Sequence, residues 1–120
     1  MLSVVTGGYG FVGANSVRAL VERGDEVRVV DKRETESLSG LAVERMQVDV
    51  LDPEALERAF AAADTVFHPA ADISIVGDPT GEVHRTNVDG PRNAGRAALA
   101  CGVKRFVHLL AHVESAIAQN

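Results

Sequence analysis

The chain has 120 residues, 46% of them hydrophobic and 24% charged, and its net charge is −5. This length suits a single domain with a core of its own. The acidic balance argues against nucleic-acid binding, which needs clustered Lys and Arg. The one cysteine, Cys101, excludes an intramolecular disulfide. No apolar run approaches the roughly 20 residues of a membrane span, and the opening residues lack the basic segment of a signal peptide, so we expect a cytoplasmic protein without membrane contact.

Short apolar strands and helices alternate along the chain. In chain order, the sequence predicts a strand at 2–6, a helix at 11–23, a strand at 26–31, a polar loop at 32–40, a strand at 43–48, a helix at 53–62, a strand at 65–68, a loop at 71–82, a helix at 83–100, a strand at 105–109 and the start of a helix at 112–119. Asp52 and Pro53 are typical of the N-cap and first turn of a helix. The last long helix carries a stripe of small and apolar residues that predicts close packing on a sheet: Val83, Asn87, Ala94, Ala97, Ala98 and Cys101.

This alternation predicts right-handed crossovers and a parallel sheet covered by helices on both faces. We therefore expect one doubly wound α/β domain over residues 1–120, with five strands in the order 3-2-1-4-5. The sheet is expected to be incomplete at its C-terminal side, because the pattern ends after the fifth strand.

A glycine-rich turn, TGGYGFVG, lies between the first strand and the first helix. Gly7 can adopt the backbone angles of a tight turn, Gly10 lets the backbone approach a pyrophosphate, and Gly13 lets the helix lie close to the strand. The N–H groups at the start of the helix, near Phe11 and Val12, would face the diphosphate. Glycines at such a turn also occur for purely structural reasons.

Asp31 strengthens the dinucleotide interpretation. It ends the second strand, about 20 residues after the glycines, where an acid can hydrogen-bond both hydroxyls of an adenosine ribose. A carboxylate there repels a 2′-phosphate, so we expect NAD as the cofactor. Lys32 and Arg33 follow directly and would favour NADP if Asp31 turned away, whereas as solvated loop charges they would have no such role.

The stretches TGGYGFVG, VVD, DVLD, VFHPAAD, NVDG and GVKRFVHL together resemble the extended short-chain dehydrogenases/reductases, the NAD-dependent epimerase/dehydratase superfamily. Residues 71–90 are most similar to dihydroflavonol reductases and 3β-hydroxysteroid dehydrogenases, with sugar-nucleotide epimerases next. The resemblance covers the whole chain but only the first half, or less, of such an enzyme. It implies a Rossmann fold and an NAD(P)-dependent oxidoreductase acting on a hydroxyl or carbonyl group of a dihydroflavonol, a steroid or a nucleotide sugar.

The resemblance also implies which residues contact the cofactor. From the pyrophosphate to the nicotinamide they are Gly7, Gly10, Phe11, Val12 and Gly13 at the turn, Asp31 with Lys32 and Arg33 at the adenosine ribose, Asp49 and the backbone of Val50 at the adenine edge, Ala70 and Ala71 beside the nicotinamide half, and Asn87 near the proton-relay water. Small residues at 70 and 71 are equally typical of tight strand–helix packing.

Two prolines depart from the usual pattern of this family. Pro91 lacks the N–H that would bond the Asn87 carbonyl in a helix, so we expect a bend there and a carbonyl that faces water or ligand. Pro69 removes a donor at the end of the fourth strand.

A complete dehydrogenase active site is not encoded in these residues. Family members use a Ser and a Tyr-x-x-x-Lys for proton transfer, but the only tyrosine is Tyr9, and Leu110 and Ala111 stand where hydroxyls are expected. We therefore name no catalytic residue. We also expect no metal site, because His108 and His112 would share a face only on a helix, and His108 is predicted in a strand.

Two functions remain open on this basis. The chain is either the nucleotide-binding portion of an oxidoreductase of this family, truncated before its substrate-binding part, or a non-catalytic module that responds to NAD. A small-molecule substrate is expected only for the full-length enzyme. Truncation would leave the fifth strand as an edge and apolar faces uncovered, so we expect a homo-oligomer.

Overall fold

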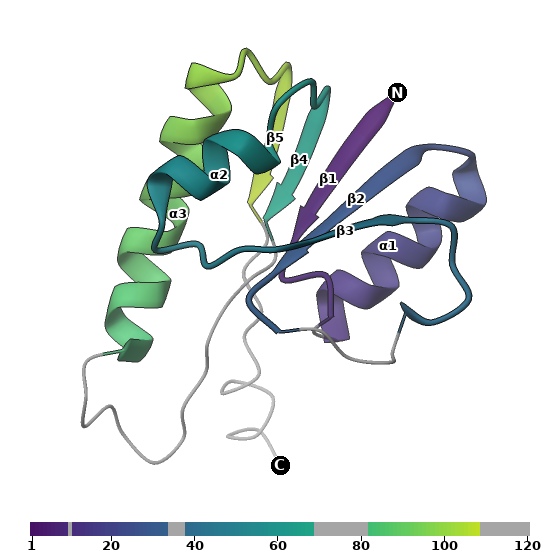
Figure 1. Ribbon diagram of the computed structural model, residues 1–120, viewed down its shortest axis with the longest axis horizontal. Coiled ribbons are helices and arrows are strands. Elements are labelled where there is room, and N and C mark those ends of the chain that lie inside the picture. The colour runs from purple at the N-terminus through teal and green to yellow at the C-terminus, as the bar shows by residue number, and fades with distance from the viewer. Residues whose placement is uncertain (10, 34–37, 69–81, 109–120) are drawn as a thin grey trace, which may run out of the picture.

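The computed structural model describes residues 1–9, 11–33, 38–68 and 82–108, with the backbone alone for residues 11 and 82–87. Strands and helices alternate along this part of the chain (Figure 1). The elements are β1 (Leu2–Thr6), α1 (Phe11–Arg23), β2 (Glu26–Asp31), β3 (Glu44–Gln47), α2 (Pro53–Ala59), β4 (Thr65–His68), α3 (Glu82–Ala100) and β5 (Arg105–His108). The helix predicted from residue 112 lies outside the described residues.

The strands form one parallel sheet in the order β3-β2-β1-β4-β5, which confirms the predicted fold. β1 pairs with β2 on one side, where Val5 lies opposite Val29, and with β4 on the other, where Val5 lies opposite Phe67. The chain therefore moves outward from β1 through β2 to β3 and then returns across the sheet to β4. The carboxyl ends of β1 and β4 flank the topological switch point, where ligands bind in sheets of this kind.

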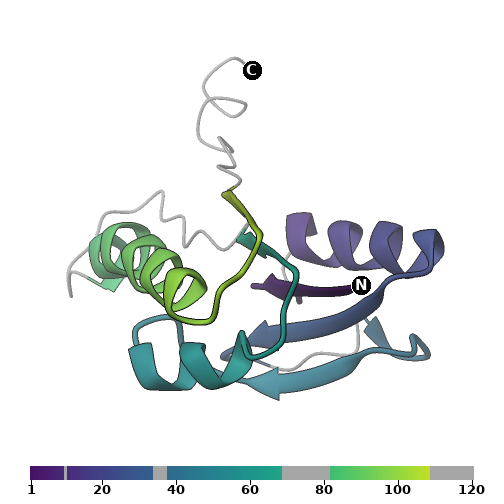
Figure 2. The ribbon, with the colours of Figure 1, turned by 90° about the horizontal axis from the view of Figure 1, so that it is seen from above.

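The helices cover both faces of the sheet, with α1 on one face and α2 and α3 on the other (Figure 2). Successive side chains of a strand point to opposite faces, so β1 contributes to two cores. Val5 lies in the cluster with Val17 and Leu20 of α1, and Val4 lies in the cluster with α2 and α3. The sheet is thus apolar on both sides, as its run of β-branched residues predicts.

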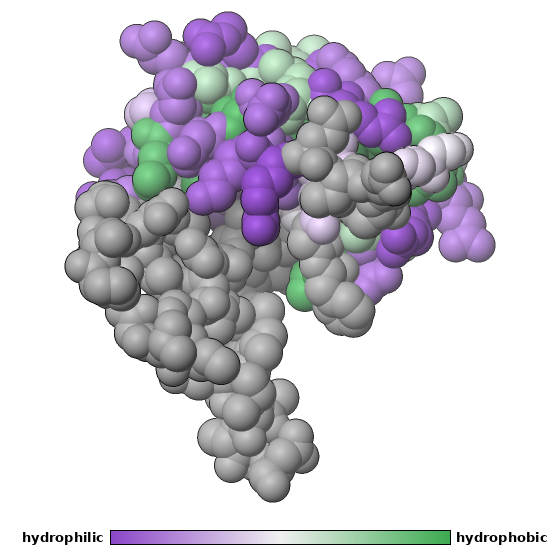
Figure 3. All heavy atoms as spheres, turned by 60° about the horizontal axis from the view of Figure 1, so that its bottom comes forward, coloured by the Kyte–Doolittle hydropathy of each residue, from purple (hydrophilic) through white to green (hydrophobic). Residues whose placement is uncertain are grey.

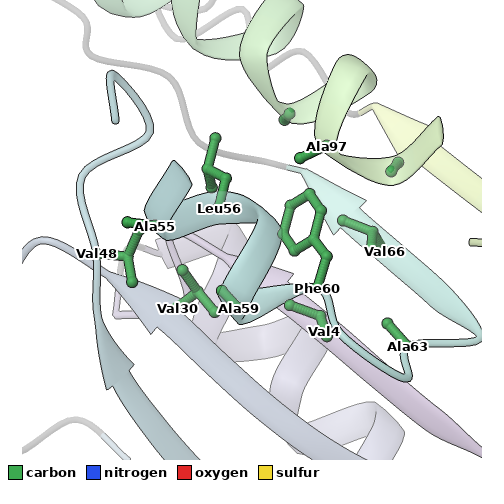
Figure 4. Packing of buried hydrophobic residues seen from close by; sticks show 12 residues of the cluster. Val4, Val30, Val48, Ala55, Leu56, Ala59, Phe60, Ala63, Val66 and Ala97 are labelled. Carbon is green, nitrogen blue, oxygen red and sulfur yellow. The ribbon is translucent and has the colours of Figure 1, made fainter. Parts of the chain in front are cut away.

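Phe60, just after α2, is the largest fully buried side chain and lies at the centre of the second cluster. Leu56, Val66 and Ala97 surround it, so that it joins α2, the sheet and α3 (Figure 4). The alanines of the stripe predicted for α3, Ala94, Ala97 and Ala98, are buried, whereas the side chains of Val83 and Asn87 lie outside the described part. Small side chains let this helix approach α2 and the sheet closely.

Helix α2 ends at Ala59, three residues before the predicted end. Asp52 caps its start as expected, since its Oδ1 accepts a hydrogen bond from the Ala55 N–H at 3.2 Å. At the other end, the Nη1 of Arg28 donates to the carbonyls of Ala59 and Ala61 over 2.7 and 2.9 Å. A side chain from β2 thus binds the backbone at the end of α2 and just after it. Ala62 follows with a φ of 65°, a conformation in which the helix cannot continue.

Other boundaries differ slightly from the predictions. β3 covers residues 44–47 rather than 43–48, and β5 is described as far as His108. Cys101 was predicted on the helix but lies just after α3, where its Sγ donates to the Glu57 carbonyl over 3.2 Å. Gly102 follows with a φ of 68°, which ends the helix.

Helix α3 continues through Pro91 without interruption. The predicted bend and the fate of the Asn87 carbonyl stay predictions. Pro69 and the loop from residue 71 lie outside the described residues. No helix in the described part of the chain is long and apolar enough to cross a membrane.

Candidate dinucleotide site

The glycine turn leads from β1 into α1 at the carboxyl edge of the sheet. Gly7 has a φ of 62°, a conformation that favours glycine, and its N–H donates to the Val30 carbonyl over 2.7 Å. A Cβ added at Gly13 would lie 2.1 Å from the Gly7 carbonyl oxygen. The start of α1 therefore lies so close to the end of β1 that only glycine fits at position 13. Gly10, which belongs to the same fingerprint, lies outside the described residues.

Gly8 is also required by packing, although no role could be assigned to it from the sequence. A Cβ there would lie 2.4 Å from Cγ1 of Val29, a buried residue of β2. The lack of a side chain at positions 8 and 13 consequently lets the turn lie close against the sheet and the end of β1. Backbone N–H groups at the start of a helix, brought this close to a strand, form an anion site of the kind that accepts a diphosphate.

Asp31 is the last residue of β2 and is only 8% exposed. Its Oδ2 accepts a hydrogen bond from the Tyr9 N–H at 3.2 Å, and its Oδ1 accepts one from the Arg33 N–H at 3.1 Å. Its backbone carbonyl accepts from the Val48 N–H at 3.0 Å. Asp31 therefore joins the glycine turn, the segment after β2 and the end of β3.

Lys32 and Arg33 are exposed beyond Asp31. The Lys32 carbonyl accepts a hydrogen bond from Nε2 of Gln47 at 3.1 Å, which attaches this segment to β3. The carboxylate of Asp31 points toward the turn, as its bond to the Tyr9 N–H requires. The alternative in which it turns away and leaves the site to the two basic residues is not the arrangement observed.

Asp49 and Val50 follow β3 on the same edge. Asp49 is exposed, and its Oδ1 accepts from the Leu51 N–H at 2.9 Å. Val50 is half-buried, and its carbonyl accepts from Nδ2 of Asn93 at 3.1 Å. Because Val48 is bonded to Asp31, the predicted adenine and ribose residues belong to one hydrogen-bonded edge.

The remaining predicted site residues are placed only in part. Phe11 is the first residue of α1, with its side chain undescribed, and Val12 is half-buried in the first turn. Asn87 lies in α3, where only its backbone is described. Ala70 and Ala71 lie outside the described residues. Their contacts with a cofactor, like those of all the predicted site residues, stay predictions.

His68 is a feature of this edge that the sequence did not single out. It is the last residue of β4 and fully buried, and its Nδ1 shares a 2.5 Å hydrogen bond with Oγ1 of Thr6, the last residue of β1. Burial lowers the pKa of His68 to about 4, and the nearby His108 adds to the effect. The ring stacks on Phe106 with centroids 6.1 Å apart and lies 5.3 Å from the His108 ring.

The Thr6–His68 bond joins the two strand ends that flank the switch point, from which the glycine turn and the segment after β4 continue. Nε2 of His68 is buried and has no hydrogen-bond partner among the described residues. The sequence offered one signal for this pair: Thr6 and His68 are the last residues of two strands that were predicted to be neighbours in the sheet. Within the described residues, no three His, Cys, Asp or Glu side chains gather in a way that could hold a metal ion.

Figure 3 shows the molecule with the carboxyl edge brought forward. The visible part of the described surface is mostly hydrophilic, and hydrophobic residues lie in small separate groups.

Tyr9 lies in the glycine turn and packs against the α1 cluster, and its hydroxyl is buried. The site described so far thus offers binding groups: backbone N–H donors at the turn, the Asp31 carboxylate beside them, and the Asp49–Val50 segment beyond.

Comparison with known proteins identifies the family of the chain. The profile of the NAD dependent epimerase/dehydratase family matches residues 3–115. A 3-beta-hydroxysteroid dehydrogenase of Mycolicibacterium neoaurum is 40% identical over 111 residues, a match that covers 88% of this chain and 30% of that protein.

Two solved structures are also similar. The UDP-glucose 4-epimerase of Thermotoga maritima, solved with UDP-glucose, has a TM-score of 0.81 at 32% identity over 90% of this chain and 37% of that chain. The UDP-glucose 4-epimerase of Thermus thermophilus, solved with NAD, has a TM-score of 0.76 at 36% identity over 88% of this chain and 36% of that chain. The chain therefore spans about a third of the length of the relatives it matches.

Proposed function

The chain belongs to the NAD-dependent epimerase/dehydratase family, and on that premise we propose that it is the dinucleotide-binding part of an NAD(P)-dependent oxidoreductase. The enzyme would act on a hydroxyl or carbonyl group of a small molecule, either a steroid, a nucleotide sugar or a dihydroflavonol. Relatives named for a steroid and for a nucleotide sugar support the first two classes. When bound, the nicotinamide of the cofactor supplies the hydride acceptor or donor.

The position of Asp31 is the observation that carries the proposal. Its carboxylate is buried beside the glycine turn and is bonded to the N–H of Tyr9 within that turn. An ionised carboxylate has about four lone-pair sites, so the two backbone bonds leave room for two ribose hydroxyls. The diphosphate attached to that ribose would then lie along the turn from Gly7 to Gly13. The N–H groups of Gly7 and Tyr9 are already bonded within the fold, so the N–H groups at the start of α1 would face it.

NAD rather than NADP is the proposed cofactor. A 2′-phosphate on the ribose would place its negative charge against the Asp31 carboxylate. Arg33 is held close by through its backbone N–H, but its side chain is exposed. We therefore expect the basic pair after β2 to add little selectivity.

The other predicted contacts complete the proposal. Asp49 and Val50 would meet the adenine edge, Ala70 and Ala71 the nicotinamide half, and Asn87 the water of a proton relay. Catalytic groups are not assigned to this chain, so the enzyme's proton transfer would depend on residues outside those named here.

Calorimetric titration of the chain with NADH and, in parallel, NADPH tests the proposal. We expect NADH to bind and NADPH to bind at least tenfold more weakly, which corresponds to about 1.4 kcal/mol. Asp31→Asn should abolish the preference, and Asp89→Asn, the same charge change at a half-buried position on α3, should retain it. Absence of binding by either dinucleotide to the folded chain would overturn the proposal.

Self-association is a further part of the proposal. Leu99 on α3 is 85% exposed and Val88 on the same helix is 39% exposed, which leaves apolar side chains at the surface. Light scattering over a range of concentrations tests it, and a constant monomer mass would contradict it.

A further inference from the structure

Helix α3 contacts the segment after β3 at Val50. Nδ2 of Asn93 donates a hydrogen bond to the Val50 carbonyl over 3.1 Å. One turn earlier, a Cβ added at Gly90 would lie 3.0 Å from Cγ2 of Val50. Residues three apart lie on the same face of a helix, so Gly90 and Asn93 form a single contact surface for Val50.

This contact fixes a short turn that is otherwise attached at its two ends. Val48 is bonded to Asp31 at one end, and Asp52 caps α2 at the other. Between them, the Asp49 carboxylate accepts from the Leu51 N–H and the Asp49 carbonyl accepts from the Asp52 N–H, both over 2.9 Å. Asn93, 43 residues from Val50, thus binds the backbone of this turn from a distant part of the chain.

We propose that Asn93 is a positioning residue for adenine, which acts by holding the backbone of Val50 in place through its carbonyl. The inference rests on the proposed function, in which Asp49 and Val50 meet the adenine edge. That edge offers an amino group that donates and a ring nitrogen that accepts. With the Val50 carbonyl bonded to Asn93, the turn presents the Asp49 carboxylate to the amino group and the Val50 N–H to the ring nitrogen.

The same geometry explains why the turn can discriminate between bases. A carboxylate and an N–H can both bond adenine only if they keep a fixed spacing. A site built in this way to bond polar groups rejects an analogue that lacks them. Hypoxanthine has a carbonyl in place of the amino group, and its adjacent ring nitrogen carries a hydrogen. An acceptor would then face the carboxylate's acceptor and a donor would face the N–H, so both contacts become repulsive. Loss of the Asn93 bond frees the backbone at Val50 to move, which weakens the adenine contacts and lessens the rejection of hypoxanthine.

The test is the ratio of two affinities, measured by calorimetry for reduced nicotinamide adenine dinucleotide and its hypoxanthine analogue. We expect the chain to prefer adenine. We expect Asn93→Ala to bind NADH roughly three- to tenfold more weakly, the value of one hydrogen bond, and the adenine preference to shrink. Asn93→Asp, which keeps the size of the side chain but removes the donor, should behave in the same way and serves if the alanine variant does not fold.

Gly95→Ala provides the matched control. Position 95 lies on the same helix, an added Cβ meets nothing within 4 Å, and alanine favours the helix over glycine. In the double variant Asn93→Ala/Gly95→Ala, the helix regains stability without the bond to Val50. An adenine preference that stays reduced in the double variant supports the positioning role, and one that returns with stability overturns it.

The two proposals fail in different ways. If the unaltered chain binds neither dinucleotide, the proposed function is wrong and this inference is wrong with it. If the unaltered chain binds NADH and both Asn93 variants keep its affinity and adenine preference, only the role of Asn93 is overturned.

Discussion

Protonation of His68 should weaken the fold in mild acid. The imidazole is fully buried, bonded through Nδ1 to Thr6 and stacked on Phe106. Burial lowers its pKa from the ordinary value of 6.5 to about 4. In the unfolded chain the imidazole is in water and binds a proton near its ordinary pKa, so the folded state holds fewer protons than the unfolded state between the two values.

The sign and size of the effect follow from this difference. Where the unfolded state binds more protons, stability rises with pH, so the contribution of His68 is complete above pH 6.5 and is lost as the pH falls toward 4. One pKa unit corresponds to about 1.36 kcal/mol. The shift from 6.5 to about 4 therefore corresponds to a loss of about 3 kcal/mol, a large part of the roughly 5–15 kcal/mol typical of a domain.

Urea unfolding followed by far-ultraviolet circular dichroism, at intervals from about pH 8 to about pH 4, measures the effect. His68→Asn keeps a group able to bond Thr6 but cannot take up a proton in this range. Its stability should be lower than that of the unaltered chain at the alkaline end, because the smaller side chain leaves a cavity. The difference between the two proteins should then shrink by about 3 kcal/mol toward the acidic end. Parallel stability curves would refute the assignment, since other titrating groups are common to both proteins.

Four further substitutions test the packing of the site and the fold. Gly13→Ala should unfold the turn and abolish NADH binding, because its Cβ would lie 2.1 Å from the Gly7 oxygen. Gly95→Ala should instead raise the free energy of unfolding by about 0.5–1 kcal/mol. Thermal melts with and without NADH measure both effects. Arg28→Met should cost about 1–3 kcal/mol in urea unfolding, because two carbonyls at the end of α2 lose their donor. Leu38→Ala should cost about 2–5 kcal/mol in the same assay, because the side chain is 1% exposed, and a loss below about 1 kcal/mol would show that the loop does not contribute to the core.

The order of the strands could be predicted because each strand and helix has its own local signal. β-branched runs, an N-cap at Asp52 and the glycine turn are all short local patterns, and the rules for parallel crossovers then leave few topologies. Leu38 was missed because it is the one apolar residue of a polar loop. Its burial depends on where that loop meets the α1 cluster, which no local pattern specifies.

The end of α2 and the role of His68 could not be predicted for the same reason. At the end of α2 the backbone turns at Ala62, and Arg28 on β2, more than 30 positions away in sequence, binds the carbonyls on either side of that end. His68 is buried because β4 enters the middle of the sheet between β1 and β5. Both are consequences of tertiary structure, and both involve side chains that are seldom fully buried.

The last residues of β1, β2 and β4 share a property that bears on cofactor choice. Thr6, Asp31 and His68 are all polar and buried, and a buried polar group is costly unless it is hydrogen-bonded. Each has a partner in a neighbouring segment: Thr6 and His68 bond each other, and Asp31 binds the N–H groups of Tyr9 and Arg33. The segments that would hold the dinucleotide are thus positioned by the same side chains that end the strands.

Changing the preference from NAD to NADP at Asp31 alone is therefore expected to fail. A neutral residue there would remove the repulsion of a 2′-phosphate, but it would also leave the Tyr9 and Arg33 N–H groups without their carboxylate acceptor. Asparagine restores one acceptor oxygen and places an amino group against the other N–H. The glycine turn would lose its attachment to β2 just where the diphosphate needs it. NADH affinity should therefore fall and the preference disappear without a gain in NADPH affinity, unless the turn is held in another way.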